Sequence, residues 1–310
     1  MTPILHHYPP SLFSEKVRLL FGYLELEWHS VIIPPIMPRP DLMPLSGGYR
    51  KTPIMQVGAN IYCDSEIICR HLAVLANDTT LYAHGFNTER VARWADTELF
   101  RIVVALNFRP EAIQAQMSQM SAADIQAFQK DRAELSAGAP NNRVDPDSAE
   151  AQFNGLLQNL ESSLVAKFLF GDTPCIADFS LYHCLWFVGQ NAANVSLLEG
   201  WPNINAYMQR IADFGHGQYT KIPSHEALKI GANAEPKAPA NARVDKKIAG
   251  DLLVGDAVTV AANDYGRNPI AGKLVSWTAS EVVISREDPK AGAVMIHVPN
   301  IGFEVAAVKS

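Results

Sequence analysis

Residues 50–68 read RKTPIMQVGANIYCDSEII, and this stretch decides the fold of the region around it. Two short runs of strand-forming residues, Pro53–Val57 and Asn60–Cys63, are separated by a glycine-containing turn, which is typical of a β-hairpin. Asp64 or Ser65 then stands directly before an apolar helical run, where an N-cap residue belongs. The stretch therefore predicts a ββα unit.

The residues before this unit predict a βαβ unit. Thr2–Tyr8 and Glu27–Ile33 are short and rich in strand-forming residues, and Ser14–Leu24 between them has helical periodicity. Such a unit normally crosses over right-handed into a parallel pair of strands. The order βαβ–ββα predicts a four-stranded mixed sheet with helices on its faces, and we place this α/β domain at residues 1–80.

Helical periodicity takes over from about Thr88 and predicts an all-α domain at residues 85–232. Its helices are expected at 88–107, 121–136, 148–166, 176–190 and 203–213. Residues 233–243 are rich in Pro and Ala and predict a linker.

Residues 244–310 predict a small all-β domain. Short runs rich in Val and Ile alternate here with Gly, Asn, Asp and Pro, and a barrel-like closure would remove exposed strand edges. The expected strands are Leu252–Val260, Ile270–Trp277, Glu281–Arg286, Ala293–Val298 and Phe303–Val308. Acidic and basic residues nearly balance here and aromatic residues are few, so we do not expect this domain to bind nucleic acid. We expect it to pack on the helical domain or on a partner subunit, with the turn Asp264–Pro269 as its contact loop.

Composition and charge argue against several classes of protein for this chain. The net charge of −6 disfavours non-specific binding of nucleic acid, which depends on Lys and Arg. No run of about 18 apolar residues predicts a membrane span, and the start of the chain lacks the features of a signal peptide, so we expect a cytoplasmic protein. The four cysteines fit no zinc spacing and are expected to be reduced, buried thiols, and no metal is predicted.

Five segments resemble, in the same order and spacing, motifs of the glutathione transferase family. They are Tyr8–Arg18, Arg50–Met55, Tyr62–Ile68, Phe168–Phe179 and Trp201–Ile204. The resemblance extends over roughly residues 1–215 and does not reach the C-terminal β-domain. It implies a thioredoxin-like glutathione-binding domain followed by the family's all-α domain, with glutathione as co-substrate.

The resemblance also implies which residues bind glutathione. Thr52 would offer its backbone to the cysteinyl part, as the residue before a cis-proline at Pro53. Lys51, with Arg50 beside it, would pair with the glycyl carboxylate, although a solvated basic pair fits the same sequence equally well.

The γ-glutamyl end is expected at Asp64 and Ser65. A helix N-terminus attracts a carboxylate through its free N–H groups, and the Asp64 carboxylate would take the ammonium group. The alternative is that the two residues only cap the helix.

Ser11 is the first candidate for the group that holds the thiolate of glutathione. It lies between strand and helix, where a hydroxyl can donate to sulfur and the helix dipole favours negative charge. Tyr8 and Ser14 are the alternatives, and Ser11 or Ser14 can also serve simply as N-cap. Family members that use Tyr usually carry a Gly-Arg pair soon after it, which is missing here.

The leading function is conjugation of glutathione to hydrophobic electrophiles, a detoxification chemistry. The resemblance places Phe13 and Trp94, with Phe100, at the electrophile site, although at helical spacing these residues fit an interdomain core equally well. The alternatives are a non-catalytic binding or regulatory protein on the same fold, or another glutathione-dependent activity such as that of a peroxidase, dehalogenase or isomerase. The family also implies a homodimer. Nucleic acid and membranes are not expected partners.

Overall fold

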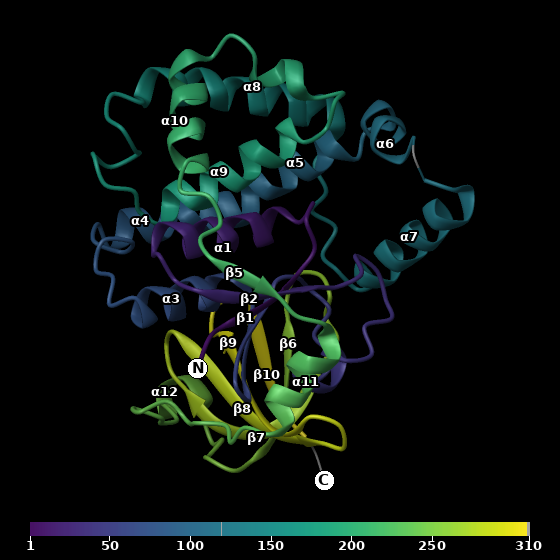
Figure 1. Ribbon diagram of the computed structural model, residues 1–310, viewed down its shortest axis with the longest axis vertical. Coiled ribbons are helices and arrows are strands. Elements are labelled where there is room, and N and C mark those ends of the chain that lie inside the picture. Colours follow the sequence, from purple (N-terminus) through teal and green to yellow (C-terminus); the bar gives the residue numbers. More distant parts are fainter. Residues whose placement is uncertain (119, 309–310) are drawn as a thin grey trace.

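The computed structural model describes residues 1–118 and 120–308 (Figure 1). Gln119 of the expected all-α domain and residues 309–310 of the expected β-domain therefore lie outside the described residues. Most helices gather at one end of the molecule, the N-terminal sheet lies in the middle, and the C-terminal strands lie at the other end together with α11 (Ser224–Ala232) and α12 (Lys246–Ala249). None of the described helices is long and apolar enough to cross a membrane.

The N-terminal part has the predicted order βαβ–ββα, with one short additional helix. Its elements are β1 (Ile4–His7), α1 (Leu12–Tyr23), β2 (Trp28–Ile32), α2 (Leu42–Ser46), β3 (Ile54–Val57), β4 (Asn60–Cys63) and α3 (Ser65–Leu75). β1 pairs in parallel with β2 and antiparallel with β3, and β3 pairs antiparallel with β4. The mixed sheet expected from the sequence is confirmed.

A helical layer follows, as the periodicity predicts. It consists of α4 (Phe86–Trp94), the π-helical segment η1 (Ala95–Leu99), α5 (Phe100–Asn107), α6 (Pro110–Met117), α7 (Ala122–Leu135), α8 (Pro146–Ser163), α9 (Ile176–Gly189), the 3₁₀ segment η2 (Val195–Leu198) and α10 (Pro202–Ala212). Helix α9 is buried along most of its length and packs against α1 and α4. This packing fixes the helical layer on the N-terminal sheet.

The chain leaves the helical layer earlier than residue 232, where we expected that domain to end. Strand β5 (Tyr219–Lys221) pairs in parallel with β2, and helix α11 (Ser224–Ala232) packs on α2 and on the C-terminal strand β9. Ala227 of α11 is fully buried in the core on that side. Strand β5 therefore extends the sheet, and α11 packs beside the sheet and not in the helical layer.

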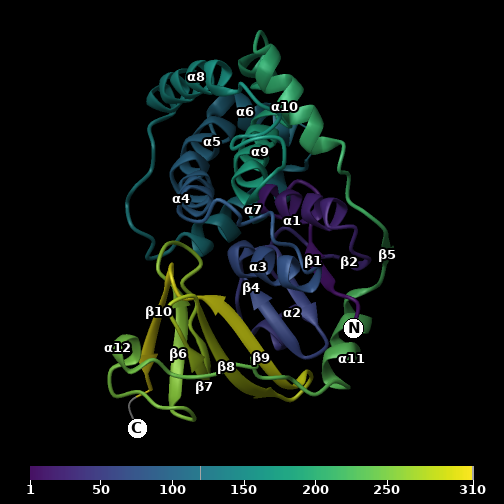
Figure 2. The ribbon, with the colours of Figure 1, turned by 90° about the vertical axis from the view of Figure 1, so that its left-hand side faces the viewer.

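The C-terminal part is all-β apart from one short helix. It comprises α12 (Lys246–Ala249), β6 (Ala257–Ala262), β7 (Ile270–Trp277), β8 (Glu281–Asp288), β9 (Gly292–Pro299) and β10 (Phe303–Ala307). The small all-β part is thus confirmed. Its strands lie in the order β10-β6-β7-β8-β9. In a closed barrel β9 would pair with β10, but here β9 pairs in parallel with β4 of the N-terminal sheet (Figure 2).

The result is one ten-stranded sheet with two hydrophobic cores. One core lies between the N-terminal sheet and the helical layer and includes Leu20, Leu99 and Phe179. The second joins the N-terminal and C-terminal sheets, with Ile54 and Ile296 in the same cluster. Because the second core is shared, the C-terminal strands are part of the body of the protein and not a module on a free linker.

Candidate glutathione site

A cavity of about 1010 Å³ opens where the three parts of the chain meet. Its walls come from α1, from the loop before β3, from the start of α3, from the α4–α5 helix and from the β6–β7 turn. Residues of the linker and of the strand ends in the C-terminal sheet complete it. No single part of the chain encloses this cavity by itself.

The five residues that the sequence assigns to glutathione binding all line this cavity: Lys51, Thr52, Pro53, Asp64 and Ser65. The peptide bond between Thr52 and Pro53 is cis, as the resemblance implied. The antiparallel pairing of β3 with β4 places the loop before β3 beside the helix start after β4. A hairpin followed by a helix thus brings the two halves of the expected site together.

Arg39, which sequence reasoning missed, holds the loop in front of β3. Its side chain is buried, and its guanidinium donates to the carbonyl of Arg50 at 2.9 Å and to Oγ1 of Thr52 at 3.1 Å. It also donates to the carbonyls of Pro34 and Pro35. A planar group with five donors suits this task, because it satisfies several carbonyls that the irregular loops leave open.

Asp64 caps α3 in an unusual backbone conformation. Its φ is 101°, which is uncommon for a residue other than glycine, and its Oδ1 accepts the N–H of Glu66 at 2.9 Å. Burial raises the pKa of this carboxyl, and Lys51 and the hydrogen bond from Glu66 oppose that effect. Strained backbone at a ligand-facing position is typical of functional sites.

Ser11 caps α1 but does not line the cavity within the described part of the chain. Only 5% of Ser11 is exposed, and its Oγ accepts the backbone N–H of Ser14 at 3.3 Å and the Ser14 hydroxyl at 2.9 Å. Ser14 is fully buried, Tyr8 is half-buried, and the cavity lining includes neither. Since Ser11 accepts both bonds, its own hydroxyl proton stays available for a further acceptor.

An ionic network lies at the cavity floor, with buried Lys16 and His183 on either side of a partly exposed Asp96, and no local sequence signal predicts it. Nζ of Lys16 lies 2.6 Å from Oδ2 of Asp96, and Nε2 of His183 lies 3.1 Å from Oδ1 of the same carboxylate. Burial by itself would raise the pKa of Asp96, but Lys16 and His183 outweigh burial and lower it to about 2. Asp96 belongs to the π-helical segment η1, and such segments occur frequently at functional sites.

The aromatic residues expected at the electrophile site are separated by the fold. Phe13 lines the cavity, and its ring lies 5.0 Å from that of Phe100, which also lines it. Trp94 is half-buried and packs against the core, outside the cavity lining. The cysteines are unpaired and buried as expected, and burial raises the pKa of Cys69 and Cys175 to about 12.

Comparison with known proteins now assigns the family. A profile of the glutathione S-transferase N-terminal domain matches residues 5–80, and one of the glutathione S-transferase C-terminal domain matches residues 117–213. A solved GST-like protein from Pseudomonas syringae is 36% identical, with a TM-score of 0.83 over 99% of this chain and 100% of that chain. The chain belongs to the glutathione S-transferase family. Among curated proteins, none matches it.

More distant members of the glutathione S-transferase fold match only part of the chain. A glutathione S-transferase from Rhodospirillum rubrum F11 is 16% identical, with a TM-score of 0.51, and FzlA from C. crescentus is 17% identical, with a TM-score of 0.50. Each match covers 68% of this chain and 88% of the other. The Pseudomonas syringae protein matches nearly the whole chain and therefore shares its length and arrangement.

The C-terminal part, which the family profiles do not cover, contributes directly to the cavity. Asp264 and Tyr265 of the β6–β7 turn lie at Lys51, and the adjacent Gly266 donates its N–H to the carbonyl of Leu135 at 2.7 Å. Arg267 donates to the carbonyl of Gly138 at 3.2 Å. The expectation that Asp264–Pro269 contacts the helical part is confirmed. Its contact with Lys51, which the sequence only predicts to bind glutathione, was not foreseen.

Proposed function

We propose that this protein is a glutathione transferase that conjugates the thiolate of glutathione to hydrophobic electrophiles. The observation that supports the proposal is the convergence of Thr52, Pro53, Asp64 and Ser65 on one cavity in a chain of this family. Thr52 offers backbone groups to the cysteinyl part, and the start of α3 offers N–H groups and a hydroxyl to the γ-glutamyl carboxylate. The Asp64 carboxylate takes the ammonium group.

In this proposal Ser11 stabilises the thiolate. A free thiol has a pKa of about 8.5, so an enzyme working near neutral pH gains from a hydroxyl donor and a helix N-terminus beside the sulfur. Ser11 supplies both, because it caps α1 and its hydroxyl proton is not used by Ser14. The electrophile would lie against Phe13 and Phe100, the apolar pair on the cavity wall.

Binding of glutathione is the first test. Calorimetry on the wild type should show binding at millimolar glutathione or below, and Asp64→Asn should weaken it by about tenfold, because a charged group loses its ionic partner. Asn keeps the helix cap and tolerates the positive φ of this position, so the substitution removes the charge and little else.

Asp172→Asn is the matched control, since Asp172 is exposed and lies outside the cavity lining. It should bind glutathione as the wild type does. A wild type that shows no heat at millimolar glutathione contradicts the proposal, and so does an Asp64→Asn protein with unchanged affinity.

A non-catalytic glutathione-binding protein is the second candidate, and the position of Ser11 outside the cavity lining favours it. A conjugation assay with a general aromatic electrophile separates the two candidates: an enzyme turns over, and a binder retains glutathione without product. Peroxidase, dehalogenase and isomerase activities would be assayed on the same preparation.

We also propose a two-fold homodimer, as is usual for this family. The edge of β4 is already paired with β9 of the same chain, so two subunits cannot join strand to strand there. Light scattering at micromolar concentration measures the assembly directly, and a monomer mass throughout would exclude the dimer.

A further inference from the structure

The two cations beside Thr52 are both paired with carboxylates from distant parts of the chain. Nη2 of Arg50 lies 2.7 Å from Oδ1 of Asp131 on α7, and Nζ of Lys51 lies 2.5 Å from Oδ1 of Asp264 on the β6–β7 turn. The Arg50 and Lys51 side chains are 13% and 10% exposed. The loop that should receive a glycyl carboxylate is therefore already neutralised by the protein itself.

Asp264 is held at Lys51 by the residues next to it. The Tyr265 ring centroid lies 4.5 Å from Nζ of Lys51, and the same ring stacks on Phe100 at 6.3 Å. Gly266 has a φ of 63°, and a Cβ there would lie 3.2 Å from Cδ1 of Leu135 and 3.3 Å from Cγ of Lys51. The turn is thus fixed between the N-terminal part and the helical layer.

An incoming carboxylate at Lys51 would meet the Asp264 carboxylate at close range. Two carboxylates that share one cation repel each other, which weakens binding of the incoming group. An amide or ester carries no charge and avoids this repulsion, and a cationic group would be attracted to the Asp264 carboxylate. Five other arginines line the cavity, and they come from α3, α4, α5 and the end of the linker, not from the loop beside Thr52: Arg70, Arg90, Arg93, Arg101 and Arg243.

We propose that Asp264 is a specificity residue that selects a γ-glutamyl-cysteinyl thiol peptide whose C-terminal carboxylate is masked as an amide. The Tyr265 ring covers the ammonium group of Lys51 and keeps the neighbouring Asp264 in contact with it. This inference rests on the proposed function, because it assumes that the thiol peptide lies along Thr52, Asp64 and Ser65. It goes beyond that function by assigning part of the substrate site to the C-terminal sheet.

The test compares two probes by calorimetry on the full-length protein: glutathione and glutathione amide, in which the glycyl carboxylate is a carboxamide. The wild type should bind the amide about fivefold more tightly, the scale of one partly exposed charge contact. Asp264→Asn should bind glutathione about fivefold more tightly than the wild type does, and the amide within a factor of two.

Glu304→Gln is the matched control, because Glu304 of β10 pairs with Arg267 of the same turn and does not contact Lys51. It should retain the preference of the wild type for the amide. The comparison of the two probes on the wild type needs no variant, so it decides the matter even where Asp264→Asn does not fold.

The outcomes separate this inference from the proposed function. Wild type that binds both probes but prefers free glutathione overturns the role of Asp264 and leaves glutathione binding standing. Wild type that binds neither probe overturns both proposals. Equal affinity for the two probes, in wild type and Asp264→Asn alike, also overturns the role of Asp264.

Discussion

At the residue scale, the proposed role of Ser11 in stabilising the thiolate of glutathione can be tested with a single substitution. We expect Ser11→Ala to lower kcat by about tenfold to a hundredfold while the KM for glutathione changes little, because the lost hydrogen bond acts on the thiolate. The pKa of the bound thiol should rise, so the pH–rate profile should shift toward alkaline pH. An unchanged profile would transfer the role to Tyr8 or Ser14, and Ser14→Ala and Tyr8→Phe would be measured next.

The residues that the sequence predicted share one property, which is that their signals are local. Thr52 and Pro53 adjoin a strand, and Asp64 and Ser65 adjoin a helix start, so a short motif names them. The partners of the basic residues are not local. Asp264 lies 213 positions from Lys51, and its role becomes visible only when the fold brings the β6–β7 turn to the cavity.

The network below the cavity has the same origin. Lys16 on α1 and Asp96 on η1 are 80 positions apart, and His183 comes from α9. Each residue taken alone is compatible with an exposed charge on an amphipathic helix. Only the contacts that the fold makes between the three side chains show that the cavity floor is ionic.

At the scale of the element, the helix formed by α4 and α5 contains a π-helical segment that the sequence does not predict. The periodicity predicts one helix over 88–107, and the structure has helix over 86–107 with the π-helical segment η1 inside it. A wide turn shifts the helix face by one residue, and a window of apolar positions does not resolve that shift. Strand β5 escaped prediction because its three residues are all exposed and have no apolar alternation.

Strand β1 makes the stability of the protein depend on pH, because it carries two buried histidines. Burial lowers the pKa of His6 to about 4, and burial together with Arg18 lowers that of His7 to about 3. Both folded-state values lie below the ordinary value, so the unfolded chain binds protons first as the pH falls. Stability is therefore full above about pH 6.5 and is lost as the pH falls toward 4.

His6→Gln should flatten this pH dependence. The glutamine amide can keep a hydrogen bond to Gln56 but does not titrate. About 3 kcal/mol of the free energy of unfolding that the wild type loses near pH 4 should therefore be retained. Urea unfolding between pH 4 and 8 measures the effect, with exposed His84→Gln as control. Parallel curves for wild type and His6→Gln would show that His6 does not titrate with folding.

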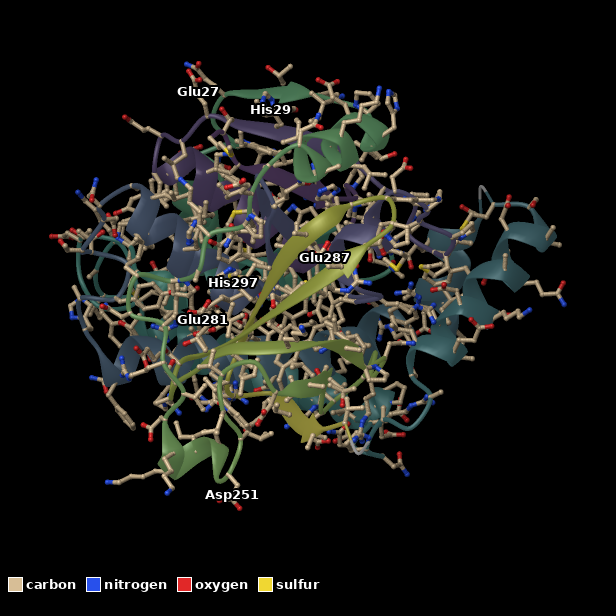
Figure 3. All side chains as sticks on the ribbon, turned by 90° about the horizontal axis from the view of Figure 1, so that it is seen from below. Glu27, His29, Asp251, Glu281, Glu287 and His297 are labelled. Carbon is tan, nitrogen blue, oxygen red and sulfur yellow. The ribbon has the colours of Figure 1, made fainter. Side chains whose placement is uncertain are left out.

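At the scale of the whole molecule, the pairing of β4 with β9, called the joint below, connects the C-terminal sheet to the N-terminal sheet. His297 of β9 and Glu281 of β8, labelled in Figure 3, lie 2.6 Å apart between Nδ1 and Oε1. Nε2 of His297 lies 2.9 Å from the side-chain amide of Asn60 on β4, and Asn60 also binds the backbone of Lys237 in the linker. Polar side chains thus join the two sheets and fasten the linker to them.

This joint predicts that the C-terminal sheet stays in place when its covalent link is cut. A protease site inserted between Asn241 and Ala242, both exposed, should allow complete cleavage. The 242–310 fragment should still co-elute with the rest on gel filtration, because Ile284 and Ile296 share a buried core with Ile54. The uncut insertion protein is the control, and cleaved protein in strong denaturant should separate into two pieces. Separation in native buffer would mean that the linker, and not the shared sheet and core, keeps Asp264 beside Lys51 in the cavity.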